Sequence, residues 1–200
     1  MGVKVPLQDT PLSAEDMALC LWYGHYRAFG EFPSFKRLGV AWAQCALENG
    51  HGTKIRNNNF GNVIATSSWP GNWWELLCHE RPYPDERPNY WVETLMRFRA
   101  LPDPETGAWH YWRTLALPRH VGALVQFDKG NPGAAAMALG ASHYYTAHAE
   151  AYAKIMRRLY TEWLSVVQSK LGLTELAEER DFWSFYEAAK GQWDNDGAHY

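Results

Sequence analysis

The residue best placed for chemistry is Glu48, which ends an apolar run just before Asn49 and Gly50. If that run is a buried helix, burial disfavours the charged carboxylate, and the negative end of the helix dipole acts in the same direction. Both effects raise the pKa, and each unit corresponds to about 1.36 kcal/mol in favour of the protonated acid. An acid that keeps its proton near neutral pH can act as a general acid toward a glycosidic oxygen. The alternative is a glutamate that simply faces solvent at a helix end.

An amide-rich loop follows Glu48 closely. Gly50 and Gly52 permit a tight exit from the helix, and residues 57–62 read N-N-N-F-G-N. The side-chain amides of this loop offer donors and acceptors to the hydroxyl or N-acetyl groups of a ligand. Asparagine amides also bond the local backbone in turns, and the loop taken alone favours that use.

Tryptophan is unusually frequent, with 11 in the chain. Trp69, Trp73 and Trp74 lie in a stretch rich in Pro and Gly, where aromatic faces can stack on sugar rings. Each can instead pack a small lobe that has few other large apolar residues. We expect one or two of the tryptophans to face a ligand.

The element that must position Glu48 is the segment 38–47, which reads L-G-V-A-W-A-Q-C-A-L with Gln44 as its one polar side chain. A helix that is apolar nearly all round is buried on every side, so we expect a central helix capped by Ser34 and closed at residues 49–50. Further helices are predicted over about 13–29, 104–117, 119–128, 132–139, 148–170 and 174–189. Short strands are predicted at 62–65, 74–77 and 90–95, and residues 1–11 are expected to be irregular. The fold class is therefore mainly α, with a small β or irregular lobe inserted after the central helix.

Composition excludes several functions. Two hundred residues fit one domain, and the formal charge of −3 comes without a basic block of the kind that binds nucleic acid or a membrane surface. The three cysteines form no zinc pattern, and no H-E-x-x-H, G-x-G-x-x-G or phosphate-loop motif occurs. No cofactor and no metal are expected. We expect a cytoplasmic product without a signal peptide, because residues 1–10 carry no apolar core.

Four segments in order carry a resemblance to a known family. Residues 46–52 (A-L-E-N-G-H-G) and the loop 57–62 resemble the A-L-E-[ST]-G-x-G and N-N-x-F-G signature of bacterial and phage β-N-acetylglucosaminidases, glycoside hydrolase family 73 of the lysozyme superfamily. Residues 97–100 (R-F-R-A), followed by the aromatics of 108–112, are similar to its F-R-x-[YF]-P-S element. Residues 144–154 are similar to its Y-A-T-x-x-x-Y-x-x-K segment. The likeness spans about residues 13–163.

This resemblance implies a lysozyme-like fold and hydrolysis of the glycan strands of peptidoglycan, most specifically as an endo-β-N-acetylglucosaminidase. Glu48 occupies the position of the catalytic acid, Glu80 that of a more variable second acid on the β lobe, and Tyr145 that of an aromatic residue beside the acid. The expected substrate-binding residues are Asn59, Phe60, Gly61, Asn62, Trp73, Trp74 and Tyr144. The expected domain covers residues 1–172, with the β lobe at about 60–98, and residues 173–200 form a helical extension packed on it.

The sequence departs from the family pattern at informative places. Asn49 stands where Ser or Thr is usual, and Asn62 stands where many members have Ile. The Trp-rich stretch 67–91 fits poorly, so Glu75, Asp85 and Glu86 compete with Glu80. The second group can also be the substrate's own N-acetyl oxygen. A muramidase, a lytic transglycosylase, or a non-catalytic glycan-binding or structural module of a phage particle or secretion system is the alternative function.

The resemblance also implies a biological setting. A wall hydrolase without a signal peptide would reach peptidoglycan in the periplasm or outside the cell through a holin, a virion or a secretion system. A monomer is expected, and an immunity protein or structural partner stays open.

Overall fold

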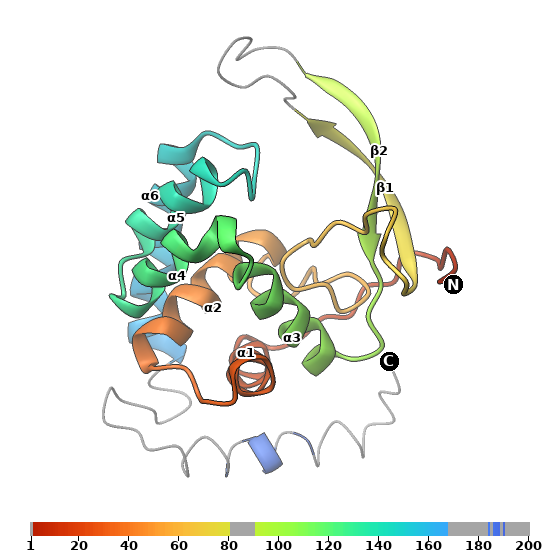
Figure 1. The fold of residues 1–200 in the computed structure, drawn as a ribbon. Coiled ribbons are helices and arrows are strands. Elements are labelled where there is room, and N and C mark those ends of the chain that lie inside the picture. The colour runs from red at the N-terminus through yellow and green to blue at the C-terminus, as the bar shows by residue number, and fades with distance from the viewer. Residues whose placement is uncertain (1, 81–90, 168–183, 185, 189, 191–200) are drawn as a thin grey trace.

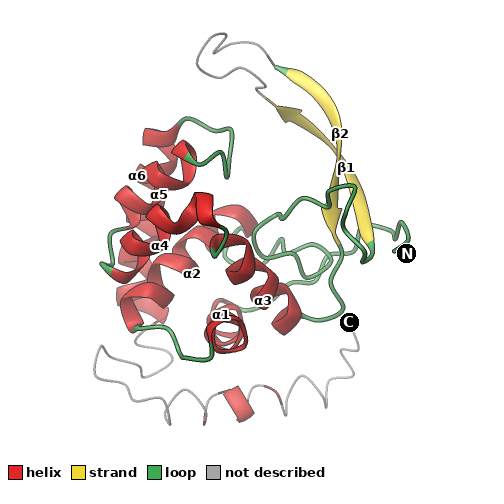
Figure 2. Ribbon diagram, in the orientation of Figure 1, coloured by secondary structure: helices red, strands yellow, loops and turns green. Residues whose placement is uncertain are grey.

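The computed structural model describes residues 2–80, 91–167, 184, 186–188 and 190. Helices gather on one side of the molecule and a two-stranded sheet lies on the other, with the loop segment 50–72 between them (Figure 1 and Figure 2). The elements in chain order are α1 (Ala14–Phe29), α2 (Phe35–Asn49), β1 (Trp73–Glu80), β2 (Val92–Arg99), α3 (Pro104–Leu115), α4 (Val121–Asp128), α5 (Pro132–Ala141) and α6 (Ala149–Glu162). A 3₁₀ turn covers Pro118–His120, and a π-helical turn covers Trp163–Val167.

Helix α2 is the central helix that its composition predicts. Every residue from Leu38 to Ala46 is buried, and α1, α4, α5 and α6 all pack against the helix. The Ser34 hydroxyl accepts a bond from the Arg37 amide at 3.2 Å, which caps its start. Gly50, at φ 54°, ends it in a left-handed cap. Close packing also fixes Gly39, because a Cβ there would lie 2.5 Å from the Trp163 ring.

The sheet is an antiparallel hairpin whose register runs from Trp73 opposite Arg99 to Glu80 opposite Val92. The strand predicted at 62–65 is wrong, because these residues form no strand. Ile64 makes only an isolated bridge to Phe98. Residues 2–11 form no helix or strand, as expected, and hydrogen bonds hold them to the domain. The Val5 amide donates to the Trp73 carbonyl at 2.8 Å, and the Asn57 side chain bonds both the Pro6 carbonyl and the Gln8 amide.

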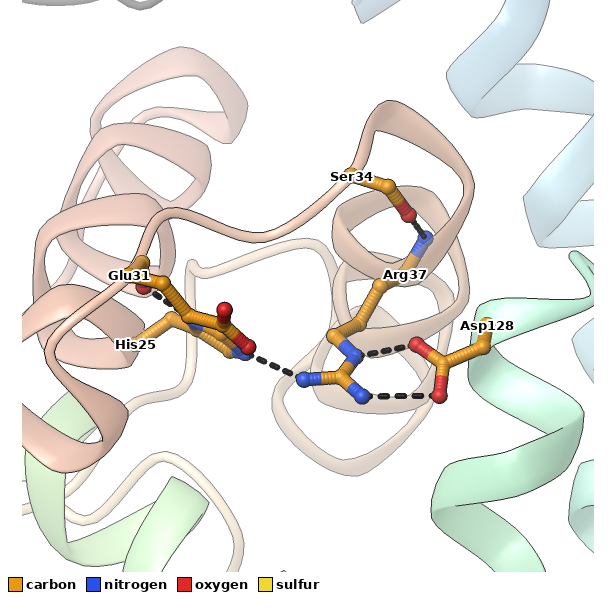
Figure 3. A network of polar contacts seen from close by, with 5 residues as sticks. All are labelled: His25, Glu31, Ser34, Arg37 and Asp128. Atoms are coloured by element: carbon orange, nitrogen blue, oxygen red, sulfur yellow. Dashed lines mark hydrogen bonds and ion pairs between the residues drawn. The ribbon is translucent and has the colours of Figure 1, made fainter.

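The start of α2 is tied to its neighbours by a charged network (Figure 3). Arg37 donates to both carboxylate oxygens of Asp128, at the end of α4, over 2.5 and 2.7 Å. It also donates to Nε2 of His25 on α1 at 2.7 Å, while Nδ1 of His25 donates to the Glu31 carbonyl at 2.7 Å. We call His25, Arg37 and Asp128 the Arg37 network.

The expected C-terminal extension is described at few positions. Residues 184, 186–188 and 190 are helical, and Tyr186 is buried against Tyr23 with ring centroids 4.7 Å apart. The rest of 174–200, and the predicted continuation of the long helix beyond 167, lie outside the described residues.

Candidate active site

Glu48 lies in the last turn of α2 and is partly buried. The Tyr152 hydroxyl, on α6, donates to its Oε1 at 2.6 Å. The Asn62 side-chain amide, from the loop, donates to its Oε2 at 3.1 Å. The end of α2, the loop that follows it and the distant helix α6 therefore meet at one carboxyl group, and each of its oxygens has one fixed donor.

Burial raises the pKa of Glu48 above its ordinary value, and the hydrogen bonds from Tyr152 and then Asn62 lower it in part. Neither donor carries a charge, and within the described part of the chain no cation bonds this carboxylate. Desolvation therefore outweighs the two donors. The arrangement favours a carboxyl group that can hold a proton toward neutral pH.

Buried tyrosine hydroxyls lie on and around the Glu48 carboxyl group. Burial raises the pKa values of Tyr111, Tyr144 and Tyr152 well above that of free tyrosine, so these groups stay neutral donors. Tyr111 donates to Oε1 of Gln44 at 2.7 Å, one turn before Glu48 on α2. We call Glu48, Asn62, Tyr144, Tyr145 and Tyr152 the Glu48 cluster.

Tyr144 approaches the loop backbone, where its hydroxyl donates to the Gly61 carbonyl at 3.1 Å. A Cβ at Gly61 would lie 2.4 Å from that hydroxyl and 2.8 Å from the Tyr111 ring, so glycine is required for this contact. Gly61 therefore shapes the site through its backbone and through the absence of a side chain.

Two of the predicted binding residues hold the loop together. The Asn59 amide accepts from the Val63 N–H at 2.7 Å and donates to the carbonyls of Val63 and Arg99 at 3.0 and 3.1 Å. The Phe60 side chain is fully buried in the core. The Asn49 amide donates to the Phe60 carbonyl, which ties the end of α2 to the loop. The structure thus places the side chains of Asn59 and Phe60 in the buried scaffold of the site.

Tyr145 contacts the donor of Glu48 and makes no hydrogen bond to Glu48 itself. Its ring stacks on Tyr152 with centroids 3.8 Å apart and planes 9° apart, and its hydroxyl donates to the Ala136 carbonyl at 2.8 Å. Sequence reasoning missed the role of Tyr152. The available signal was ambiguous, because Tyr152 shares a helix face with the buried residues Met156 and Leu159.

The two tryptophans predicted to bind substrate, Trp73 and Trp74, are neighbours on β1 but differ in burial. Trp74 is 1% exposed and stacks on Phe98 with ring centroids 4.7 Å apart, so it belongs to the core. Trp73 is half-buried, and the Arg97 guanidinium lies 4.2 Å from its ring centroid.

The candidate second acids lie on or beyond β1. Glu75 pairs with Lys4 at 2.5 Å and Arg97 at 3.3 Å, and hydrogen bonding from Lys4 holds the pKa of its carboxyl below the usual value. This commits Glu75 to an ion-pair network. Glu80 is the last residue of β1, but its side chain lies outside the described part, as do Asp85 and Glu86.

The described residues contain no group of three or more His, Cys, Asp or Glu side chains that could hold a metal ion. No helix among them is long and apolar enough to cross a membrane.

No protein-family model matches this chain, and no curated protein matches it. The fold is similar to that of the peptidoglycan hydrolase from Sphingomonas sp. A1, with a TM-score of 0.57 and 21% identity over 82% of this chain and 96% of that one. A mutant form of that hydrolase gives a TM-score of 0.59 and 21% identity over 78% and 97%. The glycoside hydrolase domain of Salmonella typhimurium FlgJ gives a TM-score of 0.52 and 21% identity over 80% and 94%. The chain therefore has the fold of these hydrolase domains, which confirms the lysozyme-like, mainly α architecture expected from the sequence.

Proposed function

We propose that this chain is a peptidoglycan hydrolase that cuts the glycan strand, and specifically an endo-β-N-acetylglucosaminidase with Glu48 as general acid. The observation that carries the proposal is the Glu48 carboxyl group, partly buried and held by two neutral donors, with a pKa above its ordinary value. The likeness of the fold to peptidoglycan and glycoside hydrolases supports the choice of substrate.

In the proposed proton transfer, Glu48, Tyr152 and Asn62 each have a part. Tyr152 and Asn62 fix the two carboxyl oxygens, so the proton of Glu48 is presented in one direction. As the glycosidic bond breaks, Glu48 gives its proton to the leaving oxygen and becomes a carboxylate. The same two donors then stabilise the carboxylate that has formed, and this lowers the barrier to bond cleavage.

The opposite face of the sugar needs a second group. Glu80 is our candidate, since it ends β1 while Glu75 is held by Lys4 and Arg97. A carboxylate about 6.5–9.5 Å from Glu48 would activate water and invert the anomeric centre, whereas one at about 5–5.5 Å would act as nucleophile and retain it. Without such a carboxylate, the substrate's acetamido oxygen would attack, and the anomeric centre would again be retained. Tyr145, whose ring stacks on Tyr152, would then contact the sugar beside Glu48.

The test is mass spectrometry of fragments that the wild type and Glu48→Gln release from purified peptidoglycan. Fragments with N-acetylglucosamine at the reducing end, absent for Glu48→Gln, would support the proposal. Anhydromuramic ends would keep Glu48 as the acid and identify a lytic transglycosylase, and free muramic ends would identify a muramidase. If neither folded protein releases fragments, the enzymatic proposal fails and a glycan-binding or structural module takes its place.

A further inference from the structure

A cavity of about 670 Å³ lies among residues that are not part of the Glu48 cluster. The N-terminal segment forms one part of its wall, residues 57–58 and 69–72 form another, and residues 100–110 complete it. Its volume lies within the range of small-molecule sites, which is about 300–1,000 Å³. Nothing in the proposed proton transfer uses this cavity.

The cavity lining combines apolar side chains with uncharged polar ones. Its lining contains no Asp, Glu, Lys or Arg, and burial lowers the pKa of its one histidine, His110, to about 4. Hydrogen-bonding groups come from the amides of Gln8 and Asn72 and the hydroxyl of Thr106, among others. The Arg99 guanidinium lies behind this lining, where it contacts the Trp69 ring and lies 3.3 Å from Nδ1 of His110. The lining suits a neutral ligand with several polar groups.

One buried acceptor in the lining is left unpaired. Asn58 is 2% exposed, its side-chain nitrogen donates to the Leu101 carbonyl at 3.0 Å, and its Oδ1 has no hydrogen-bond partner among the described residues. Exchanging the oxygen and nitrogen of this amide would set two acceptors against each other at Leu101, so the bonding pattern fixes the orientation. A buried acceptor without a donor is unfavourable. Because Oδ1 has almost no accessible surface, a ligand O–H or N–H would satisfy it after a small shift of the Asn58 side chain toward the cavity.

An apolar surface lies in the same lining. The Trp69 indole is held in place, because its Nε1 donates to the Asn72 carbonyl at 2.9 Å and the Arg99 guanidinium lies 4.4 Å from its ring centroid. Close packing adds to this, since a Cβ at Gly71 would lie 2.6 Å from the ring. Saccharides combine an apolar CH surface with several O–H and N–H donors, which is the chemistry that Trp69 and Asn58 together complement.

We propose that this cavity is a second carbohydrate-binding site, which takes an uncharged sugar unit against Trp69 and receives a donor from it at Oδ1 of Asn58. The choice of N-acetylated sugars as ligands rests on the proposed function. The inference that the cavity binds a sugar rests on its lining residues alone. In an enzyme that cuts a glycan strand, such a site would hold the polymer while Glu48 acts elsewhere on it, so the protein would stay on its substrate between cuts.

The test uses nuclear magnetic resonance on full-length ¹⁵N-labelled Glu48→Gln protein, titrated with N,N′,N″-triacetylchitotriose or with cellotriose. The indole signal of Trp69 is identified by its loss in the Trp69→Phe variant, and the indole of Trp91, 53% exposed on the hairpin side, is the matched control. We expect a saturable shift of the Trp69 signal and little change at Trp91. Trp69→Ala should weaken the binding that the remaining cavity signals report by about tenfold or more.

Each outcome of the titration supports or overturns a stated proposal. Shifts with both sugars support a hydroxyl donor at Asn58, and shifts with chitotriose alone support its acetamido N–H. No saturable shift at Trp69, or a shift confined to Trp91, overturns the proposal and leaves a cavity that holds water only. Fragment release by the wild type is measured separately. Cleavage without a Trp69 shift therefore sinks this inference alone, and a Trp69 shift without cleavage sinks the proposed function alone.

Discussion

The two ends of α2 hold buried titratable groups in opposite ways. At the start of the helix, the Arg37 network surrounds His25 with a cation on one ring nitrogen and a carbonyl on the other. At the end, about 16 Å further along the axis, neutral donors surround Glu48. His25 cannot gain a proton without losing its bond from Arg37, whereas Glu48 can gain one and keep its neighbours. The first arrangement fixes a structure, and the second leaves a proton available for chemistry.

The largest expected effect is on catalytic activity and comes from a substitution of Glu48. Glu48→Gln keeps the shape and an acceptor for Tyr152 but removes the proton donor, so the rate of fragment release should fall by about 10²–10⁴-fold. The assay is release of soluble glycan from purified peptidoglycan under saturating substrate. Glu162→Gln is the matched control, because Glu162 pairs with the exposed side chain of His51 at the same end of α2. An equal fall in both variants would argue that the charge of the region matters rather than this acid.

The next effect belongs to His25 and concerns stability alone. Burial, as the main cause, lowers the pKa of His25 from 6.5 to about 4. Between about pH 6.5 and pH 4, the unfolded chain therefore binds a proton at His25 that the folded chain does not bind. The free energy of unfolding should fall as the pH falls through this range, by at most about 3 kcal/mol. Urea unfolding across this window should show the loss in the wild type and a smaller one in His25→Gln, which has no proton to gain. Parallel curves for the two proteins would contradict this account.

The two ends of α2 differ also in how far sequence could predict them. The burial of residues 38–46 followed from one property, the near absence of polar side chains, and it placed Glu48 correctly at the end of a central helix. The caps at Ser34 and Gly50 follow from local chemistry as well. Such features depend on neighbours in the chain, so the pattern predicts them.

Contacts between distant segments could not be predicted in this way. Tyr152 reaches Glu48 across 104 positions, and the choice between Tyr145 and Tyr152 depends on how α6 packs against α2. Asn59 and Asn62 have the same side chain in the same loop, yet one bonds the backbone and the other bonds the acid. The backbone path decides between them, since Asn62 takes a left-handed φ of 49°. Residue type alone carries no such information.

A third prediction concerns the stability of the Glu48 end of α2 as the pH rises. Because the pKa of Glu48 is raised in the folded protein, that state binds a proton that the unfolded chain has lost, and stability falls as the pH rises from about 4.5 through the raised pKa. Glu48→Gln removes this loss. The variant should therefore gain stability relative to the wild type as the pH rises to 7, in contrast to the acid-side effect at His25. Thermal unfolding across this range measures the difference, and a stability difference between the two proteins that stays constant from pH 4.5 to pH 7 would oppose the prediction.

A smaller effect is expected when one donor is removed. Tyr152→Phe keeps the ring stacked on Tyr145 but removes the 2.6 Å bond that stabilises the carboxylate. The pKa of Glu48 should rise, so the alkaline limb of the rate profile should move to higher pH. Tyr145→Phe is the matched control, because the Tyr145 hydroxyl bonds the Ala136 carbonyl instead. An alkaline limb that moves equally in both variants would show that the tyrosine pair acts through packing.

The smallest effect separates the two donors of Glu48. The Asn62 bond is longer, at 3.1 Å, and it lowers the pKa of Glu48 less than the Tyr152 bond does. Removing it should move the alkaline limb in the same direction by a smaller step. Glycine is the right replacement, because it adopts a φ of 49° without strain, whereas most other residues do not. Asn62→Ala would add backbone strain to the loss of the amide, and the two effects could not be separated. If Asn62→Gly moves the limb further than Tyr152→Phe, the amide rather than the phenol is the main stabiliser of the carboxylate, and the order of the two donors must be reversed.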